Sequence, residues 1–185
     1  MVRIFIAIDI EDPVLLSRIV RMRDAVVATG VPMKPVETEN LHITLRFIGE
    51  VPVGTVDAVK DVLSTLSFDE FRIVLHGLGA FPSPARPRVV WVGVSEGWEE
   101  LRRIRDTIEK GLRSIGIPGE RQDFHPHITL ARIKGSRGIS KLIRLLEEYS
   151  DYDFGETVVR SVRLKKSTLT RRGPIYETLM EVKAR

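Results

Sequence analysis

The tetrapeptide His-Ile-Thr-Leu occurs twice in this chain, beginning at His42 and again at His127. Side chains alternate across a β-strand, so in each copy the histidine and the threonine share one face, and the isoleucine and the leucine share the other. Two facing imidazoles suit a phosphate ester, because one can take a proton from the nucleophile while the other protonates the leaving oxygen. The hydroxyls of Thr44 and Thr129 can donate to the non-bridging oxygens. The sequence therefore predicts an acid–base pair of histidines.

A metal site is the main alternative for one of these motifs. His125 and His127 are two residues apart, so an extended strand could offer both imidazoles to a metal ion. No third ligand at an obvious spacing accompanies them, and the chain has no cysteine. We therefore expect catalysis without a metal or any other cofactor. The remaining histidine, His76, is expected to be a structural residue at a strand end.

The offset of 85 residues between the two motifs also relates the segments around them, which indicates a duplicated chain. The first half is expected to contain a strand at 3–9, a helix at 12–29, the motif strand at 41–49, a helix at 55–66 and a strand at 71–78. In the second half the same order of elements is expected at 88–94, 97–114, 126–133, 140–149 and 156–164. One further strand is expected at 175–182. We expect a single bilobal domain over residues 1–185, with repeat halves at approximately 1–85 and 86–185.

The composition narrows the class of protein. A chain of 185 residues with 43% hydrophobic residues is typical of a globular protein, and no stretch is long and apolar enough to cross a bilayer. The N-terminus lacks the cleavage site of a signal peptide, so we expect a cytoplasmic protein, with a monomer as the default. The net charge of +4 is compatible with a polyanionic partner. A single asparagine and a single glutamine among many charged residues indicate a heat-loving source.

The paired motifs resemble those of a known family, the 2H phosphoesterases. The segments HITLRFIGE at 42–50 and FHPHITLAR at 124–132 are similar to the two signatures of its RNA 2′,3′-cyclic phosphodiesterase branch, the LigT-like 2′-5′ RNA ligases. The opening strand RIFIAIDI at 3–10 is similar to that branch as well. The resemblance implies an α+β fold in which a pseudo-twofold duplication of a β-α-β-α-β unit gives two antiparallel sheets that flank a central cleft, with the helices outside.

The resemblance also implies an activity. The family hydrolyses RNA that ends in a 2′,3′-cyclic phosphate to leave a 2′-phosphate, and the reverse reaction joins RNA ends, such as those of tRNA halves, through a 2′-5′ linkage. On this basis His42 is expected to be the proton donor to the leaving 3′ oxygen and His127 the proton acceptor that activates water. The near-symmetry of the two motifs does not by itself distinguish these roles.

Five further side chains are expected to bind the substrate. Arg46 lies on the same strand face as the first histidine and should reach the cleft. Arg132 falls formally on the opposite face, so the phosphate-holding role that the family implies for it requires a strand end or a bulge. Phe124 is expected to stack on the terminal base, whereas Phe47 is expected to belong to the core. The two remaining candidates, from the C-terminal strands, are Ser167 and Tyr176.

Two other functions remain open from the sequence. The substrate could be a small cyclic nucleotide or ADP-ribose cyclic phosphate instead of RNA. Alternatively, the chain could be a module that binds RNA ends without chemistry. Two intact His-x-Thr pairs argue against the second alternative, because binding alone would tolerate the loss of one histidine. Basic clusters outside the motifs favour an RNA as the partner. The resemblance implies that this RNA has 2′,3′-cyclic phosphate ends.

Overall fold

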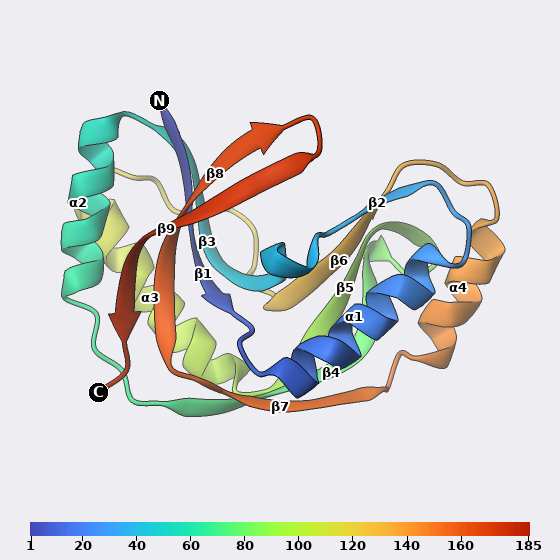
Figure 1. Ribbon diagram of the computed structural model, residues 1–185. Helices are drawn as coiled ribbons and strands as arrows, with labels where there is room; N and C mark the ends of the chain where they lie inside the picture. The colour runs from blue at the N-terminus through green and yellow to red at the C-terminus, as the bar shows by residue number, and fades with distance from the viewer.

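The computed structural model describes residues 1–185, which form nine strands, four helices and one 3₁₀ turn (Figure 1). The strands are β1 (Val2–Asp9), β2 (Met33–Pro35), β3 (His42–Val51), β4 (Phe71–Ser83), β5 (Arg86–Glu96), β6 (His127–Ile133), β7 (Asp153–Val159), β8 (Ser161–Thr170) and β9 (Gly173–Lys183). The helices are α1 (Pro13–Val27), α2 (Val53–Ser64), α3 (Trp98–Ser114) and α4 (Ile139–Glu148), and the 3₁₀ turn is η1 (Thr38–Asn40). None of the four helices combines the length and the apolarity needed to span a membrane.

Local sequence explains where the first helix begins and ends. The Asp12 carboxylate accepts hydrogen bonds from the backbone N–H groups of Val14 and Leu15, at 2.9 and 3.0 Å, and so satisfies two donors at the start of α1. Pro13 occupies the first turn, where its missing N–H has no cost. Beyond the helix, Gly30 adopts a φ of 81°, a left-handed conformation that favours glycine. The predicted helix at 12–29 is confirmed.

All the strands belong to one sheet, in the order β7-β4-β5-β6-β3-β1-β8-β9, with β2 paired to β6. At its centre, β3 and β6 pair only at Ile43 and Ile128, so two antiparallel halves meet along a narrow seam. We call β3, β1, β8 and β9 with α2 and α3 the first lobe, and β6, β5, β4, β7 and β2 with α1 and α4 the second lobe. The α+β class and the antiparallel pairing agree with the expectation, but the two expected sheets are continuous.

The lobes do not coincide with the halves of the sequence. Strand β4 follows the first motif along the chain, yet it pairs with β5 and β7 of the second lobe. Conversely, β8 returns to pair with β1 of the first lobe. The single strand expected at 156–164 is in fact two strands, β7 and β8, which run in different lobes and are separated at Arg160. Each lobe is therefore assembled from both halves of the chain.

The apolar residues of the two motifs anchor their strands in the core. Ile43 and Leu45 are 0% and 1% exposed, and Ile128 and Leu130 are both fully buried. They belong to one cluster of 37 buried apolar residues that extends through both lobes. Because both apolar pairs are buried, the opposite face of each strand, which carries the histidine and the threonine, points away from this core.

Candidate active site

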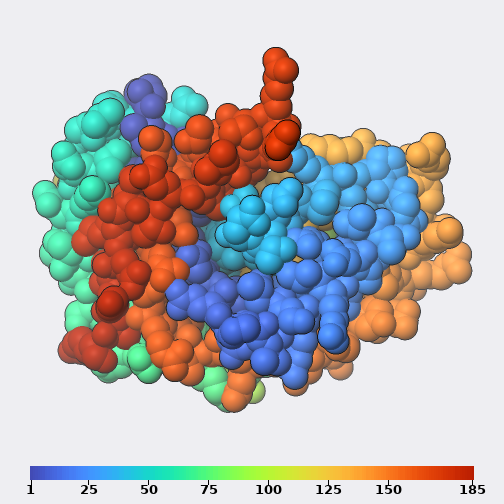
Figure 2. Space-filling view, viewed as in Figure 1, coloured from blue at the N-terminus to red at the C-terminus, as the bar shows by residue number.

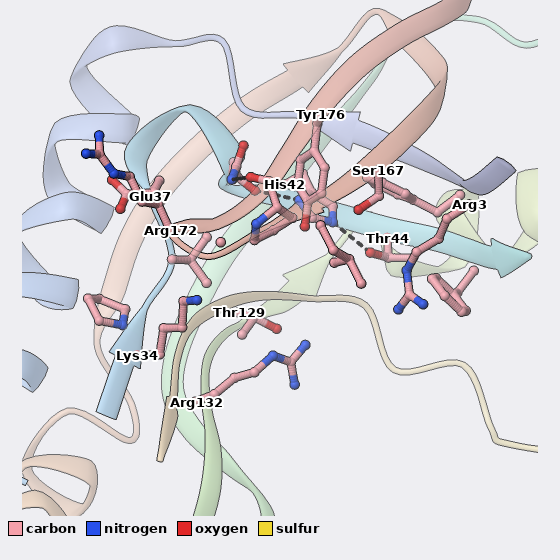
Figure 3. Close-up of a pocket in the computed structure, with 18 of the residues that line it drawn as sticks. Arg3, Lys34, Glu37, His42, Thr44, Thr129, Arg132, Ser167, Arg172 and Tyr176 are labelled. Atoms are coloured by element: carbon pink, nitrogen blue, oxygen red, sulfur yellow. Dashed lines mark hydrogen bonds between the residues drawn. The ribbon is translucent and has the colours of Figure 1, made fainter. Parts of the chain in front are cut away.

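The two His-Thr pairs line a single cleft with a volume of about 360 Å³. His42 and Thr44 enter it from β3, and His127 and Thr129 enter it from β6. Figure 3 shows His42, Thr44 and Thr129 in this cleft. The hairpin of β8 and β9 bounds the cleft on one side, and its tip lies beside the segment that carries β2 and η1 (Figures 1 and 2). The structure thus brings together the four residues that the repeated motif predicts.

A β-bulge in each motif strand changes which residues follow the histidine into the cleft. In β3, Thr44 pairs with Ala7 but Arg46 already pairs with Ile6, so Leu45 is an extra residue. Two consecutive residues, Leu45 and Arg46, are consequently buried on the side away from the cleft. The next residue, Phe47, returns to the cleft face.

The second motif strand has the same bulge 85 residues later. Thr129 pairs with Trp91 while Ala131 pairs with Val90, which leaves Leu130 as the extra residue. Arg132 therefore turns back toward the cleft and lines it. The bulge that the expectation for Arg132 required is present.

The prediction for Arg46 was wrong, because the bulge turns this side chain away from the cleft. Arg46 is 4% exposed and forms a buried ion pair with Glu109. Two of its other N–H groups donate to the backbone carbonyls of Phe47 and Pro118, each at 2.5 Å. Arg46 thus joins β3 to α3 and to the loop that follows α3.

The predictions for the two phenylalanines were also wrong. Phe47 is 41% exposed and lines the cleft, with the Arg3 guanidinium 4.8 Å from the centre of its ring. Phe124 lies outside the cleft, packs against the hydrophobic core and has the Arg105 guanidinium 5.2 Å from its ring centre. Simple alternation along β3 placed Phe47 in the core because it does not include the extra residue.

Both imidazoles are held in the same way. His42 Nδ1 donates to the backbone carbonyl of Asn40 at 2.6 Å, and His127 Nδ1 donates to that of His125 at 2.5 Å. A carbonyl can only accept, so the proton of each neutral ring is fixed on Nδ1. The Nε2 atoms are left for chemistry, and His42 Nε2 lies 2.8 Å from Thr44 Oγ1.

Burial lowers the pKa of both histidines below its usual value, and the surrounding charges differ between the two. At His42, the carbonyl of Asn40 and the negative charge of Asp9 oppose the shift, while Lys165 adds to it. The free protein therefore favours neutral imidazole at this site.

At His127, the carbonyl of His125 opposes the lowered pKa, but the charges of His125, His42 and Arg132 all add to the shift. No carboxylate contributes there. A nearby carboxylate thus opposes the lowered pKa of His42 but not that of His127.

The side chains behind His42 form a packed network. Its ring meets Phe5 at 5.1 Å and the edge of Tyr176 at 5.4 Å between centroids. The amide of Asn40, which is 6% exposed, donates to the carbonyl of Pro174 in β9 at 2.9 Å. Asn40 therefore connects the β8–β9 hairpin to the carbonyl that holds His42.

Four cations line the cleft: Arg3, Lys34, Arg132 and Arg172. None of them forms an ion pair, although many arginines elsewhere in the chain do. Glu37 is the one carboxylate in the lining. An anionic ligand would supply the missing counter-charge.

Comparison with known proteins agrees with this geometry. Residues 16–166 match the model of the 2′-5′ RNA ligase superfamily. The chain belongs to this superfamily. It is 57% identical over 170 residues to an RNA 2′,3′-cyclic phosphodiesterase of Aeropyrum pernix, covering 92% of this chain and 97% of the relative. It is 40% identical over 177 residues to an RNA 2′,3′-cyclic phosphodiesterase of Archaeoglobus fulgidus, covering 96% and 97%. The sources of these relatives fit the heat-loving origin that the composition indicates.

Solved structures share the fold of this chain. The protein TT0787 of Thermus thermophilus superimposes with a TM-score of 0.81 at 27% identity, covering 98% of this chain and 97% of that chain. LigT of E. coli in complex with 3′-AMP gives a TM-score of 0.77 at 24% identity, covering 99% and 98%. The similarity to LigT shows a shared fold and nothing more.

Several residues of the cleft were not identified from the sequence. Arg3 and Phe5 share a face of β1, so strand alternation could have placed them together once β1 was known to border the site. Asn40 is the single asparagine of the chain. It lies two residues before His42, just as His125 lies two residues before His127. Lys34 carries no comparable local signal. Ser167 and Tyr176, in contrast, line the cleft as expected.

The alternative metal site lacks a complete set of ligands. His125 packs its ring against Phe81 and Trp91, at 5.2 and 5.0 Å between centroids. No group of three or more His, Cys, Asp or Glu side chains is arranged to hold a metal ion. His76 pairs with Asp151 at 2.6 Å, away from the cleft.

Proposed function

We propose that this chain hydrolyses RNA 2′,3′-cyclic phosphate ends to 2′-phosphates through acid–base catalysis by two histidines. The observation that carries the proposal is the matched anchoring of the two imidazoles, each fixed at Nδ1 by a carbonyl two residues earlier, in one cationic cleft. The names of the relatives with 57% and 40% identity support the same activity.

In the proposed reaction, His127 Nε2 accepts a proton from water as the water oxygen attacks phosphorus. The bond from phosphorus to the 3′ oxygen breaks, and His42 Nε2 protonates that oxygen, which leaves the phosphate on the 2′ oxygen. The mechanism requires a neutral His127 and a protonated His42. The charge of Arg132 adds to the lowered pKa of His127, whereas the charge of Asp9 opposes the lowering of the pKa of His42 by burial, and both effects support this assignment.

The bound phosphate supplies what the free cleft lacks. Its negative charge near His42 raises the pKa of that imidazole, so the acid becomes protonated when the substrate is present. Thr44 and Thr129 donate to the non-bridging oxygens, and Arg132 neutralises charge that accumulates there. Ser167 and Tyr176 complete the wall beside His42; burial raises the pKa of Tyr176, which keeps its phenol neutral.

The direct test is hydrolysis of a short RNA that ends in a 2′,3′-cyclic phosphate, measured in EDTA with the product mapped as a 2′- or 3′-phosphate. We expect a 2′-phosphate, and we expect His42→Ala and His127→Ala each to lose about 10²-fold or more in kcat while circular dichroism stays unchanged. His76→Ala is the matched control, since this histidine lies outside the cleft.

Several outcomes would contradict the proposal. Binding of the RNA end without any turnover would favour the non-catalytic module. Loss of activity in EDTA would restore the metal hypothesis. Turnover of a cyclic mononucleotide or of ADP-ribose cyclic phosphate, with no turnover of RNA, would support the small-substrate alternative. The use of tRNA halves, the reverse ligation, the monomeric state and the cytoplasmic location stay predictions.

A further inference from the structure

The two ends of the cleft differ in chemistry. Figure 3 shows Arg3 on one side of His42 and Thr44, and Lys34 and Arg172 on the other. Phe47, with the Arg3 guanidinium over its ring, belongs to the first end and offers flat surfaces on which a base can stack. The second end offers cations in place of stacking surfaces.

The two cations of the second end come from different lobes. Lys34 lies on β2, opposite Arg132 of β6. Arg172 lies in the turn between β8 and β9, and the residue after it, Gly173, adopts a φ of 117°. A Cβ atom at Gly173 would lie 3.6 Å from Lys34 Cε, so the hairpin tip touches β2 across the cleft.

Glu37 is the one carboxylate that lines this end of the cleft (Figure 3). Neither Lys34 nor Arg172 forms an ion pair, and Glu37 is not within 4.0 Å of their charged atoms. Elsewhere in the same hairpin, Arg163 contacts three carboxylates, whereas Lys34 and Arg172 form no ion pair. Unpaired cations that meet from two lobes are suited to an anion that enters between them.

We infer that Lys34 and Arg172 bind the phosphodiester backbone of RNA on the 5′ side of the terminal nucleotide. The inference rests on the proposed function, which places the cyclic phosphate between the histidines. Arg132 is the strand neighbour of Lys34, so the cation for the scissile phosphate and the cation for the next phosphate lie side by side. The terminal base then lies toward Phe47 and Arg3. This second site distinguishes an RNA end from a cyclic mononucleotide.

The test compares two substrates, a cyclic mononucleotide and a trinucleotide that ends in a 2′,3′-cyclic phosphate. We expect Lys34→Ala with Arg172→Ala to reduce the ratio of kcat/KM for the trinucleotide to that for the mononucleotide by about 10- to 100-fold. The salt dependence of kcat/KM for the trinucleotide should also weaken by a slope of about 0.7 for each lost phosphate contact. Arg171→Ala, at the neighbouring tip residue outside the cleft lining, should keep the wild-type ratio.

A change on the substrate side makes the test specific. A trinucleotide with neutral methylphosphonate linkages removes the charges that Lys34 and Arg172 are inferred to bind. In a double-mutant cycle, this substrate should show little further loss with the double variant. An unchanged ratio in the double variant, or additive losses in the cycle, refutes the inference and leaves the proposed function intact. Absence of turnover of both substrates by the wild type refutes the proposed function, and with it the inference.

Discussion

Asn40 offers the sharpest test of how the fold positions the proposed acid. Its side-chain amide donates to the carbonyl of Pro174 at 2.9 Å, and its backbone carbonyl accepts from His42 Nδ1 at 2.6 Å. In Asn40→Ala the carbonyl remains, but its anchor to β9 is lost. We expect His42 to lose its fixed orientation, so that kcat decreases about tenfold while KM changes less.

The same change has a calculable effect on stability. A part-buried carbonyl that loses its donor costs about 1–2 kcal/mol, the lower part of the range for an unsatisfied group. For a chain of this length, each kcal/mol changes Tm by about 2–4 °C, which gives a decrease of about 2–8 °C. Differential scanning calorimetry measures this directly. Gln122→Ala is the matched control, because it removes the chain's other side-chain amide at an exposed position.

The variant Asn40→Asp distinguishes a role of Asn40 in positioning His42 from a role in packing alone. It keeps the shape of the side chain, replaces the donor with an acceptor and adds a negative charge near His42. The limb of the pH–rate profile that reports His42 should therefore move to higher pH. If both variants lower Tm but leave kcat and the pH–rate profile within about twofold of the wild type, Asn40 is a structural residue only and the reasoning is refuted.

Three further predictions follow from the buried charges. The folded pKa values of His42 and His127 lie below 6.5, so the unfolded chain binds more protons in acid than the folded chain does. The free energy of unfolding should therefore have its full value above about pH 6.5. It should decrease as the pH falls through the folded pKa values. Urea unfolding at about pH 7.5 and pH 5 should show this decrease, and it should be smaller in a variant with both histidines changed to glutamine. Glu109→Gln leaves the charge of Arg46 buried and should destabilise the fold by about 3–5 kcal/mol in urea unfolding, whereas Glu109→Leu combined with Arg46→Leu should destabilise it less. Asp9→Asn removes a charge that raises the pKa of His42, so the His42 limb of the pH–rate profile should move to lower pH; movement to higher pH would contradict this electrostatic account.

The sequence predicts most of the elements and the central residues of the site, because both depend on local periodicity. Helix α1, predicted at 12–29, buries Leu15, Ile19, Met22 and Val26, which recur at helical spacing. The position of Arg46 could not be predicted in the same way. A bulge is defined by the strand opposite, and the 85-residue repeat identifies equivalent residues without identifying their partners.

The pairing of the strands could not be predicted from the sequence for the same reason. The repeat relates β4 to the segment that forms β7 and β8. It does not show that β4 pairs in the second lobe or that β8 pairs in the first lobe. The break between β7 and β8 lies at Arg160, within a run in which valines on both sides favour strands. Long-range pairing, and not local propensity, decides where that run divides.

The crossing of the strands has a consequence for how the protein is made. Strand β1 precedes the other eight strands along the chain and has β8 as one of its two neighbours, and Arg3 is paired with Ser167. The first lobe therefore stays open along one edge of β1 until β8 has been synthesised. Contacts this distant in sequence slow folding, because a long loop must close before any pairing is gained. A nascent or truncated chain that lacks β8 and β9 also lacks one wall of the cleft, so we expect activity only after both strands have been synthesised.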